Sequence, residues 1–146
     1  MSPRAHSMSI ESATRNLGAV RNFVRQHAEA SGFPAAAVQQ MMLAVDEACS
    51  NVIRHAYSGD EQGRVEVEIS IGPETFRVII RDHGQAFKPS AYEPPNLYHS
   101  VKRRKGGGFG VHIMRRLMDE VEYATRGGVN EVRLTKHRTP QSGDGL

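Results

Sequence analysis

Two hairpins of alternating apolar residues constrain the fold of this 146-residue chain more than any other feature. Apolar and polar side chains alternate along four short segments, each pair joined by a glycine-containing turn: 65–71, 76–80, 121–125 and 131–136. Alternation with a period of two is typical of strands that have one buried and one wet face. Because tight turns join antiparallel strands and leave no room for a crossover helix, the sheet is predicted to be largely antiparallel.

Three segments have the three-and-four spacing of amphipathic helices. The first runs from about Ser12 to the Ser31-Gly32 stop, the second covers roughly 34–56, and the third follows the glycine run 106–110. Since the hairpin turns place no helix on the opposite side, all three must share one face of the sheet. The sequence therefore predicts an α+β two-layer sandwich with a mixed, mainly antiparallel sheet and its helices on one face.

The chain is predicted to contain one domain, 9–136, between a loose N-terminus, 1–8, and a flexible tail, 137–146. Its single cysteine, Cys49, lies in the apolar stripe of the second helix and is expected in the core. One cysteine forms no intrachain disulfide, and the first thirty residues contain no apolar run typical of a signal peptide or a membrane span. We expect a cytoplasmic protein without membrane contact.

The positive charge of the chain is local. Its net charge is +3, but four adjacent cations lie in 102–105, and without them 15 cations face 16 carboxylates. A nucleic-acid-binding surface needs basic residues spread over a face or a helix. Direct binding to nucleic acid is therefore not predicted, and the function of this basic segment becomes the question.

Glu47 and Asn51 lie four residues apart on the second predicted helix, so they share one of its faces about 6 Å apart along the axis. This face lies nearly opposite the apolar stripe and beside the small residues Ala44 and Ala48. A carboxylate and an amide with little bulk around them suit a polar site. The alternative, that this is the solvated side of an amphipathic helix, stays open.

Asp82 ends an apolar strand and is followed by His83 and Gly84. A carboxylate in this position can accept a hydrogen bond from an exocyclic amino group, and the glycine lets a flat ring approach the backbone. The same three residues also suit a simple turn that closes the strand.

The glycines of 106–110 precede a helix and follow the four cations. Uncovered N–H groups and the positive end of a helix dipole form an anion site, most often for phosphate. The pattern is neither a P-loop nor a dinucleotide fingerprint. A flexible hinge is the alternative, and the adjacent cations favour phosphate.

Together, the segments LAVDEACSNVIRHAY (43–57), RDHGQAF (81–87) and KGGGFGVHIMRRLMDEVEY (105–123) resemble the Bergerat-type ATPase superfamily. More closely, the chain resembles the bacterial anti-sigma factor serine/threonine kinases. The resemblance implies the Bergerat ATP-binding fold with ATP and Mg²⁺ as cofactors. It makes Glu47 the general base, Asn51 the magnesium ligand, and Asp82 with Gly84 the adenine site.

The resemblance also implies that 88–105 forms a lid over ATP. The residues expected to contact the nucleotide there and in the glycine run are Arg104, Lys105, Gly106, Gly107, Gly108, Phe109 and Gly110. Ala86 departs from the superfamily pattern, which usually has a second glycine in this position. No helix pair with a phosphoacceptor histidine precedes the domain in this sequence, so we do not expect a self-contained two-component histidine kinase.

The implied function is an ATP-dependent serine/threonine protein kinase and anti-sigma factor. Proteins of this family phosphorylate an antagonist of the STAS fold and sequester a sigma factor. They usually form dimers, so a homodimer is possible here. The alternative is a non-catalytic, nucleotide-binding partner-switching module that acts by sequestration. Arg15, Arg21 and Arg25 on the first helix are either a docking face for an acidic partner or a solvated helix side.

Overall fold

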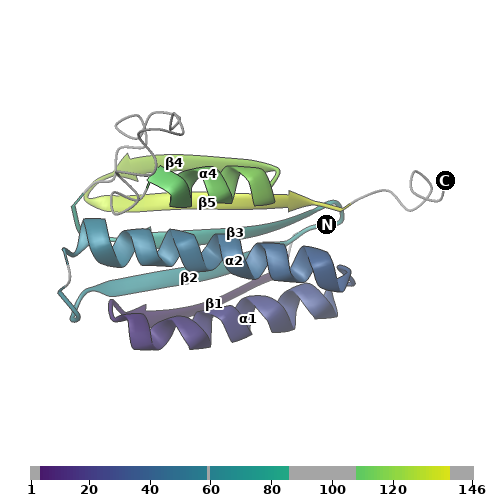
Figure 1. The fold of residues 1–146 in the computed structure, drawn as a ribbon, viewed down its shortest axis with the longest axis horizontal. Coiled ribbons are helices and arrows are strands. Elements are labelled where there is room, and N and C mark those ends of the chain that lie inside the picture. The colour runs from purple at the N-terminus through teal and green to yellow at the C-terminus, as the bar shows by residue number, and fades with distance from the viewer. Residues whose placement is uncertain (1–3, 59, 86–107, 139–146) are drawn as a thin grey trace.

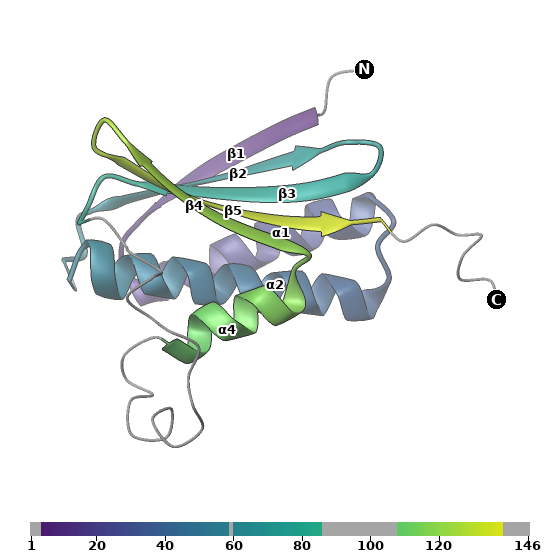
Figure 2. The ribbon, with the colours of Figure 1, turned by 90° about the horizontal axis from the view of Figure 1, so that it is seen from above.

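The computed structural model describes residues 4–58, 60–85 and 108–138. Figure 2 shows five strands in one layer and three helices against one face of that layer. In chain order the elements are β1 (Arg4–Glu11), the 3₁₀ turn η1 (Thr14–Asn16), α1 (Leu17–Ala30), α2 (Ala35–Asn51), the π-helical turn η2 (Val52–Ala56), β2 (Arg64–Ile71), β3 (Thr75–Asp82), α4 (Gly108–Leu117), β4 (Glu120–Arg126) and β5 (Val129–His137). The predicted α+β sandwich is confirmed.

The strands have the order β1-β2-β3-β5-β4, and all four pairings between them are antiparallel (Figure 1). The sheet of the described residues is therefore antiparallel throughout and not mixed as predicted. The alternation predicted which side chains face the helices. Their buried members are Val65, Val67, Ile69, Phe76, Val78, Ile80, Val132 and Leu134. The opposite face is polar, and Arg81 there contacts Glu68 at 2.8 Å and Glu131 at 2.9 Å.

The helices supply the other half of the core. Val20 and Val24 of α1 and Met41 and Val45 of α2 are buried against the sheet side. The second helix follows its prediction to Asn51, and the chain then continues to Ala56 as one π-helical turn. Such turns are frequent at functional sites, because they change the direction in which neighbouring side chains and carbonyls point. None of the helices in the described ranges is long and apolar enough to span a membrane.

The prediction of a loose terminus over 1–8 is wrong for residues 4–8. They belong to β1, an edge strand whose Met8 and Ile10 pair with Val67 and Val65 of β2. Serine has a low strand propensity, which hid the short alternation in the sequence. Backbone pairing with β2 along the whole strand stabilises β1 where its side chains contribute little.

The core position predicted for Cys49 is confirmed, because its side chain is fully buried. Burial raises the pKa of its thiol to about 12, and Asp46 adds to the rise. Only the thiolate reacts with disulfide reagents. We therefore expect the thiol to react at least about 10³-fold more slowly in the folded protein than in urea, as measured with a chromogenic disulfide. Equal rates in the two states would contradict the packing of α2.

Candidate nucleotide site

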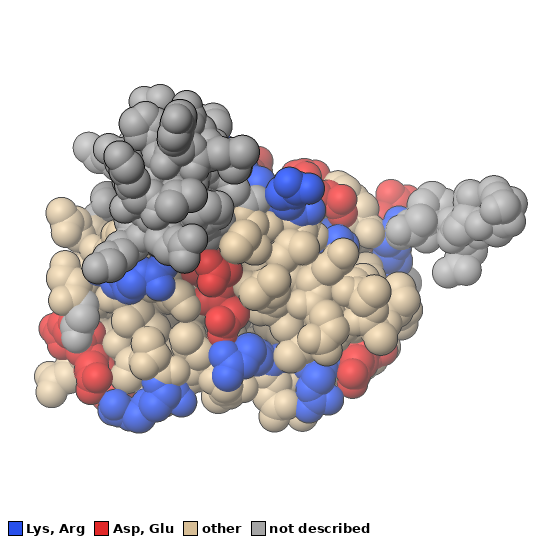
Figure 3. Space-filling model, in the orientation of Figure 1, with Lys and Arg blue, Asp and Glu red and all other residues tan. Residues whose placement is uncertain are grey.

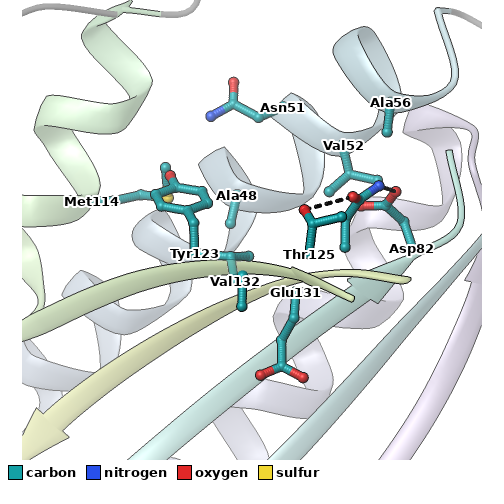
Figure 4. A pocket seen from close by; sticks show the side chains of 12 residues that line it. Ala48, Asn51, Val52, Ala56, Asp82, Met114, Tyr123, Thr125, Glu131 and Val132 are labelled. Atoms are coloured by element: carbon teal, nitrogen blue, oxygen red, sulfur yellow. Dashed lines mark hydrogen bonds between the residues drawn. The ribbon is translucent and has the colours of Figure 1, made fainter. Parts of the chain in front are cut away.

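A pocket opens between the helix layer and one end of the sheet, with about 420 Å³ of empty space that is partly open to solvent. Figure 4 shows Asn51 of α2 on one side and Asp82 at the end of β3 on the other. The residues that line it are Ala48, Asn51, Val52, Ala56, Asp82, Met114, Tyr123, Ala124, Thr125, Asn130, Glu131 and Val132. The side chain of Glu131 points away from it (Figure 4). Two predicted site residues, distant in sequence, thus meet in one pocket.

Most of the pocket wall is uncharged. Val52, Met114 and Val132 contribute apolar side chains. Met114, on α4, is almost fully buried. Burial raises the pKa of Tyr123 to about 12, which keeps its phenol neutral. Apolar walls with a few polar groups are the usual environment for a flat heterocyclic ligand.

Asn51 is buried, with 5% of its surface exposed, so the solvated side of an amphipathic helix does not describe it. Its Oδ1 accepts a hydrogen bond from Arg54 Nη2 at 2.8 Å. Its Nδ2 is buried and has no hydrogen-bond partner among the described residues. A buried polar group left unsatisfied costs about 1–3 kcal/mol. An orphaned amide that lines an open pocket indicates that a ligand completes the site.

Glu47 lies one turn before Asn51 on α2 and is half-buried outside the pocket lining. No described residue forms a hydrogen bond or an ion pair with its carboxylate, while its neighbour Asp46 pairs with Arg21 at 2.6 Å. Within the part of the chain that the structure describes, no ion pair therefore competes for the Glu47 carboxylate.

Asp82 is 4% exposed and its Oδ1 accepts two hydrogen bonds, from Gly84 N at 2.9 Å and from Asn130 Nδ2 at 2.7 Å. None of the hydrogen bonds among the described residues uses Oδ2. Sequence reasoning missed Asn130, because the predicted strand began at 131. The alternation along β5 could have identified it, because Asn130 lies two residues before Val132 and four before Leu134 and so faces the same side of the sheet.

Gly84 was expected to admit a flat ring next to the backbone. The structure gives a different close neighbour: a Cβ on Gly84 would lie 2.3 Å from the carbonyl oxygen of Ala56. That oxygen also accepts a hydrogen bond from Gln85 N at 2.7 Å. The glycine thus lets the segment after β3 pack against the end of η2, and it holds the Asp82 side of the pocket to the Asn51 side.

Replacing Gly84 with alanine is expected to lower the free energy of unfolding by about 1–3 kcal/mol, because the new methyl group overlaps backbone atoms that cannot rotate away. Urea denaturation measures the change. Gly18→Ala is the matched control, since its methyl group meets only Arg21 Nη2, at 3.6 Å. Equal stability of the two variants would contradict the close packing at Ala56.

The rest of the predicted nucleotide site lies mostly outside the described residues. This holds for the lid over 88–105, for Arg104 and Lys105, and for Gly106 and Gly107. The remaining predicted residues, Gly108, Phe109 and Gly110, form the first turn of α4. A helix therefore starts within the glycine run, as the anion-site prediction requires. In the described part of the chain, no cluster of three or more His, Cys, Asp and Glu side chains could hold a metal ion.

The three arginines predicted on the first helix are all paired, and the first of them, Arg15, lies in η1 just before α1. Arg15 contacts Glu61 at 3.1 Å, and Arg21 and Arg25 contact Asp46 and Glu29, respectively, at 2.6 and 3.4 Å. On the face shown in Figure 3, both basic and acidic side chains lie along and just above the lower edge, where α1 lies in Figure 1. Paired charges favour the solvated helix side over a docking face for an acidic partner.

A family model described as a histidine kinase-like ATPase domain matches residues 10–136. The serine-protein kinase RsbW of Bacillus velezensis is 31% identical over 134 residues, covering 89% of this chain and 83% of the relative. The RsbW of Bacillus pumilus is 32% identical over 135 residues, covering 88% and 83%. The serine/threonine-protein kinase BtrW of Bordetella bronchiseptica is 29% identical over 102 residues, covering 70% and 72%.

Solved structures share the fold. The RsbU and RsbW domains of Rv1364c from Mycobacterium tuberculosis superpose with a TM-score of 0.63 at 16% identity, over 94% of this chain and 33% of that one. The blue-light activated histidine kinase EL346 of Erythrobacter litoralis superposes with a TM-score of 0.58 at 19% identity, over 89% and 43%. This chain thus spans less than half of either solved chain.

Proposed function

Because the chain belongs to the histidine kinase-like ATPase domain family, together with the serine-protein kinases RsbW, we propose that it is an ATP-dependent protein serine/threonine kinase and anti-sigma factor. Its substrate is a small antagonist protein of the STAS fold, and its second partner is a sigma factor in the cytoplasm. The observation that carries the proposal is the single pocket that joins the orphaned amide of Asn51 to the carboxylate of Asp82.

The Asp82 end of the pocket binds adenine in this proposal. Oδ2 of Asp82 accepts a hydrogen bond from the exocyclic amino group, and the apolar side chains of Val52, Met114 and Val132 pack against the ring. Gly84 keeps the segment after Asp82 against Ala56 and thereby fixes the position of the carboxylate.

The Asn51 end binds the triphosphate with Mg²⁺. Magnesium prefers oxygen ligands and keeps several waters, so one amide oxygen together with phosphate oxygens is a sufficient site. The residues fit this ion, because Oδ1 of Asn51 already faces a cation, the guanidinium of Arg54, and a phosphate oxygen would give the unpaired Nδ2 donor the acceptor that the described residues do not supply. Held by Asn51 Oδ1, such an ion would neutralise charge on the transferring phosphoryl group. We assign Arg104, Lys105 and the glycine-rich residues 106–110 to the phosphates as well.

Glu47 is the general base for the substrate hydroxyl. Its carboxylate, which has no partner among the described residues, takes the proton from the serine, whose oxygen forms a bond to the γ-phosphorus while the bond to the β,γ-bridging oxygen breaks and ADP leaves. Proton transfer by a positioned carboxylate contributes about 10² to 10⁴ in rate. Glu47 is adjacent in sequence to Ala48 of the pocket lining, and its side chain is only partly buried.

Transfer of a γ-phosphate label from ATP tests this function. The protein is incubated with labelled ATP, Mg²⁺ and each STAS-domain protein encoded near its gene, and the labelled residue is identified by mass spectrometry. We expect a phosphoserine or phosphothreonine on one of these antagonists. ATP binding without any phosphoprotein product across the panel contradicts the kinase and supports a non-catalytic partner-switching module.

A further inference from the structure

A row of three polar residues crosses the inner face of the sheet at its pocket end. Asp82 of β3 is the register partner of Asn130 of β5, which in turn is the register partner of Thr125 of β4. The next inward row, Ile80, Val132 and Tyr123, is apolar apart from one phenol. Asp82 and Asn130 are buried there, while Thr125 is exposed on the edge strand, and buried polar groups are costly unless they form hydrogen bonds. This row is therefore a built network.

Hydrogen bonds connect the row from end to end, as the dashed lines between Thr125 and Asp82 in Figure 4 show. Thr125 Oγ1 donates to Asn130 Oδ1 at 3.0 Å, and Asn130 Nδ2 donates to Asp82 Oδ1 at 2.7 Å. Asn130 Nδ2 also reaches Gly84 O at 2.9 Å. A carboxylate is only an acceptor, so it selects the amide orientation in which Nδ2 faces it, and the Thr125 hydroxyl satisfies the oxygen that remains.

The network occupies one of the two carboxylate oxygens of Asp82 with two hydrogen bonds. Oδ1 holds the Asn130 amide and the Gly84 N–H, while no described residue bonds to Oδ2. With Oδ1 engaged, the Asp82 carboxylate offers a base a single free acceptor oxygen. One acceptor suits the lone amino group at the edge of adenine. Guanine presents two donors, N1–H and the 2-amino group, which require both oxygens of a carboxylate.

We propose that Asn130, oriented by Thr125, is the positioning residue that restricts Asp82 to one free oxygen and so makes the pocket selective for a base with a single exocyclic amino donor. The inference rests on the proposed function, because it assumes that a nucleotide occupies this pocket. Asn130 does not contact the reacting atoms. It acts through Asp82, and its effect falls on the choice of nucleobase.

Binding of three triphosphates separates this role from a merely structural one. The probes are ATP, GTP and purine riboside triphosphate, which lacks the 6-amino group, and their affinities are measured by calorimetry for the full chain. We expect ATP to bind at least about tenfold more tightly than the purine analogue to the wild-type protein, since one hydrogen bond to a charged group separates them. We expect Asn130→Ala to reduce that ratio to about threefold or less, and to narrow the gap between ATP and GTP.

Thr125→Val provides a second variant. It replaces only the hydroxyl of the exposed Thr125 with a methyl group, so the hydrogen bond from Asn130 to Asp82 can remain. We expect a smaller fall of the ATP-to-analogue ratio, about twofold to threefold. Asn22→Ala, on the exposed side of α1, is the control and should leave the ratio unchanged. A loosened fold weakens all three nucleotides equally, so an unchanged ratio in Asn130→Ala overturns the inference. Wild-type protein that binds no nucleotide overturns the proposed function itself.

Discussion

Replacing Glu47 with glutamine is expected to slow phosphoryl transfer about 10²- to 10⁴-fold while the affinity for ATP stays within about twofold of the wild type. Glutamine keeps the size of the side chain and removes its capacity to take a proton. The Glu47 carboxylate has no partner among the described residues, so no ion pair is lost and folding should be unaffected. Single-turnover transfer to the antagonist measures the chemical step, and calorimetry measures ATP binding.

The matched control is Glu29→Gln, an exposed glutamate at the end of α1 whose only described partner is Arg25. It should transfer phosphate at the wild-type rate. Full transfer by Glu47→Gln would remove Glu47 as the base. A parallel loss of ATP affinity would instead place Glu47 in nucleotide binding.

Replacing Asp82 with asparagine is expected to weaken ATP binding about 10- to 150-fold, the equivalent of one hydrogen bond to a charged group. The amide oxygen can still accept from Gly84 N and Asn130 Nδ2, so the network beneath it survives. In place of Oδ2 the variant has an NH₂ group. This group and the amino group of adenine are both donors, so no hydrogen bond can form between them. Affinity should fall much more than stability.

Asp119→Asn is the control for this change, because Asp119 Oδ2 also accepts a backbone hydrogen bond, from His137 N at 2.6 Å, at an exposed position. It should bind ATP as the wild type does. Calorimetry and urea denaturation of both variants separate affinity from stability. Unchanged ATP affinity in Asp82→Asn would exclude this carboxylate from base recognition.

Much of the fold follows from periodicity. The alternation in 65–71 and 76–80 fixed both the hairpin and the inward set of side chains, since a strand has only two faces. The helices had to cover one face, because short turns allow no other path. Periodicity failed for β1, an edge strand in which small and polar residues accompany Met8 and Ile10. Its pairing depends on backbone bonds to β2, and these leave little trace in composition.

The site was predictable in part. Asn51 and Asp82 were recognised in separate segments, and the fold brings both to one pocket. The role of Gly84 depends on the approach of Ala56, a contact that a local motif cannot show. Asn130 was missed for the same reason, because its function arises from its register with Asp82 across two strands. The pairing of Arg21 with Asp46 likewise joins two helices, so the charge pattern of α1 alone overstated its free positive charge.

The most direct test of the account is a crystal structure of the full chain with a non-hydrolysable ATP analogue and Mg²⁺. The account predicts the adenine amino group at hydrogen-bond distance from Asp82 Oδ2, the ring against Val52 and Val132, and the metal on Asn51 Oδ1 in place of Arg54. A nucleotide bound elsewhere, or one whose base turns its amino group away from Asp82, would contradict it.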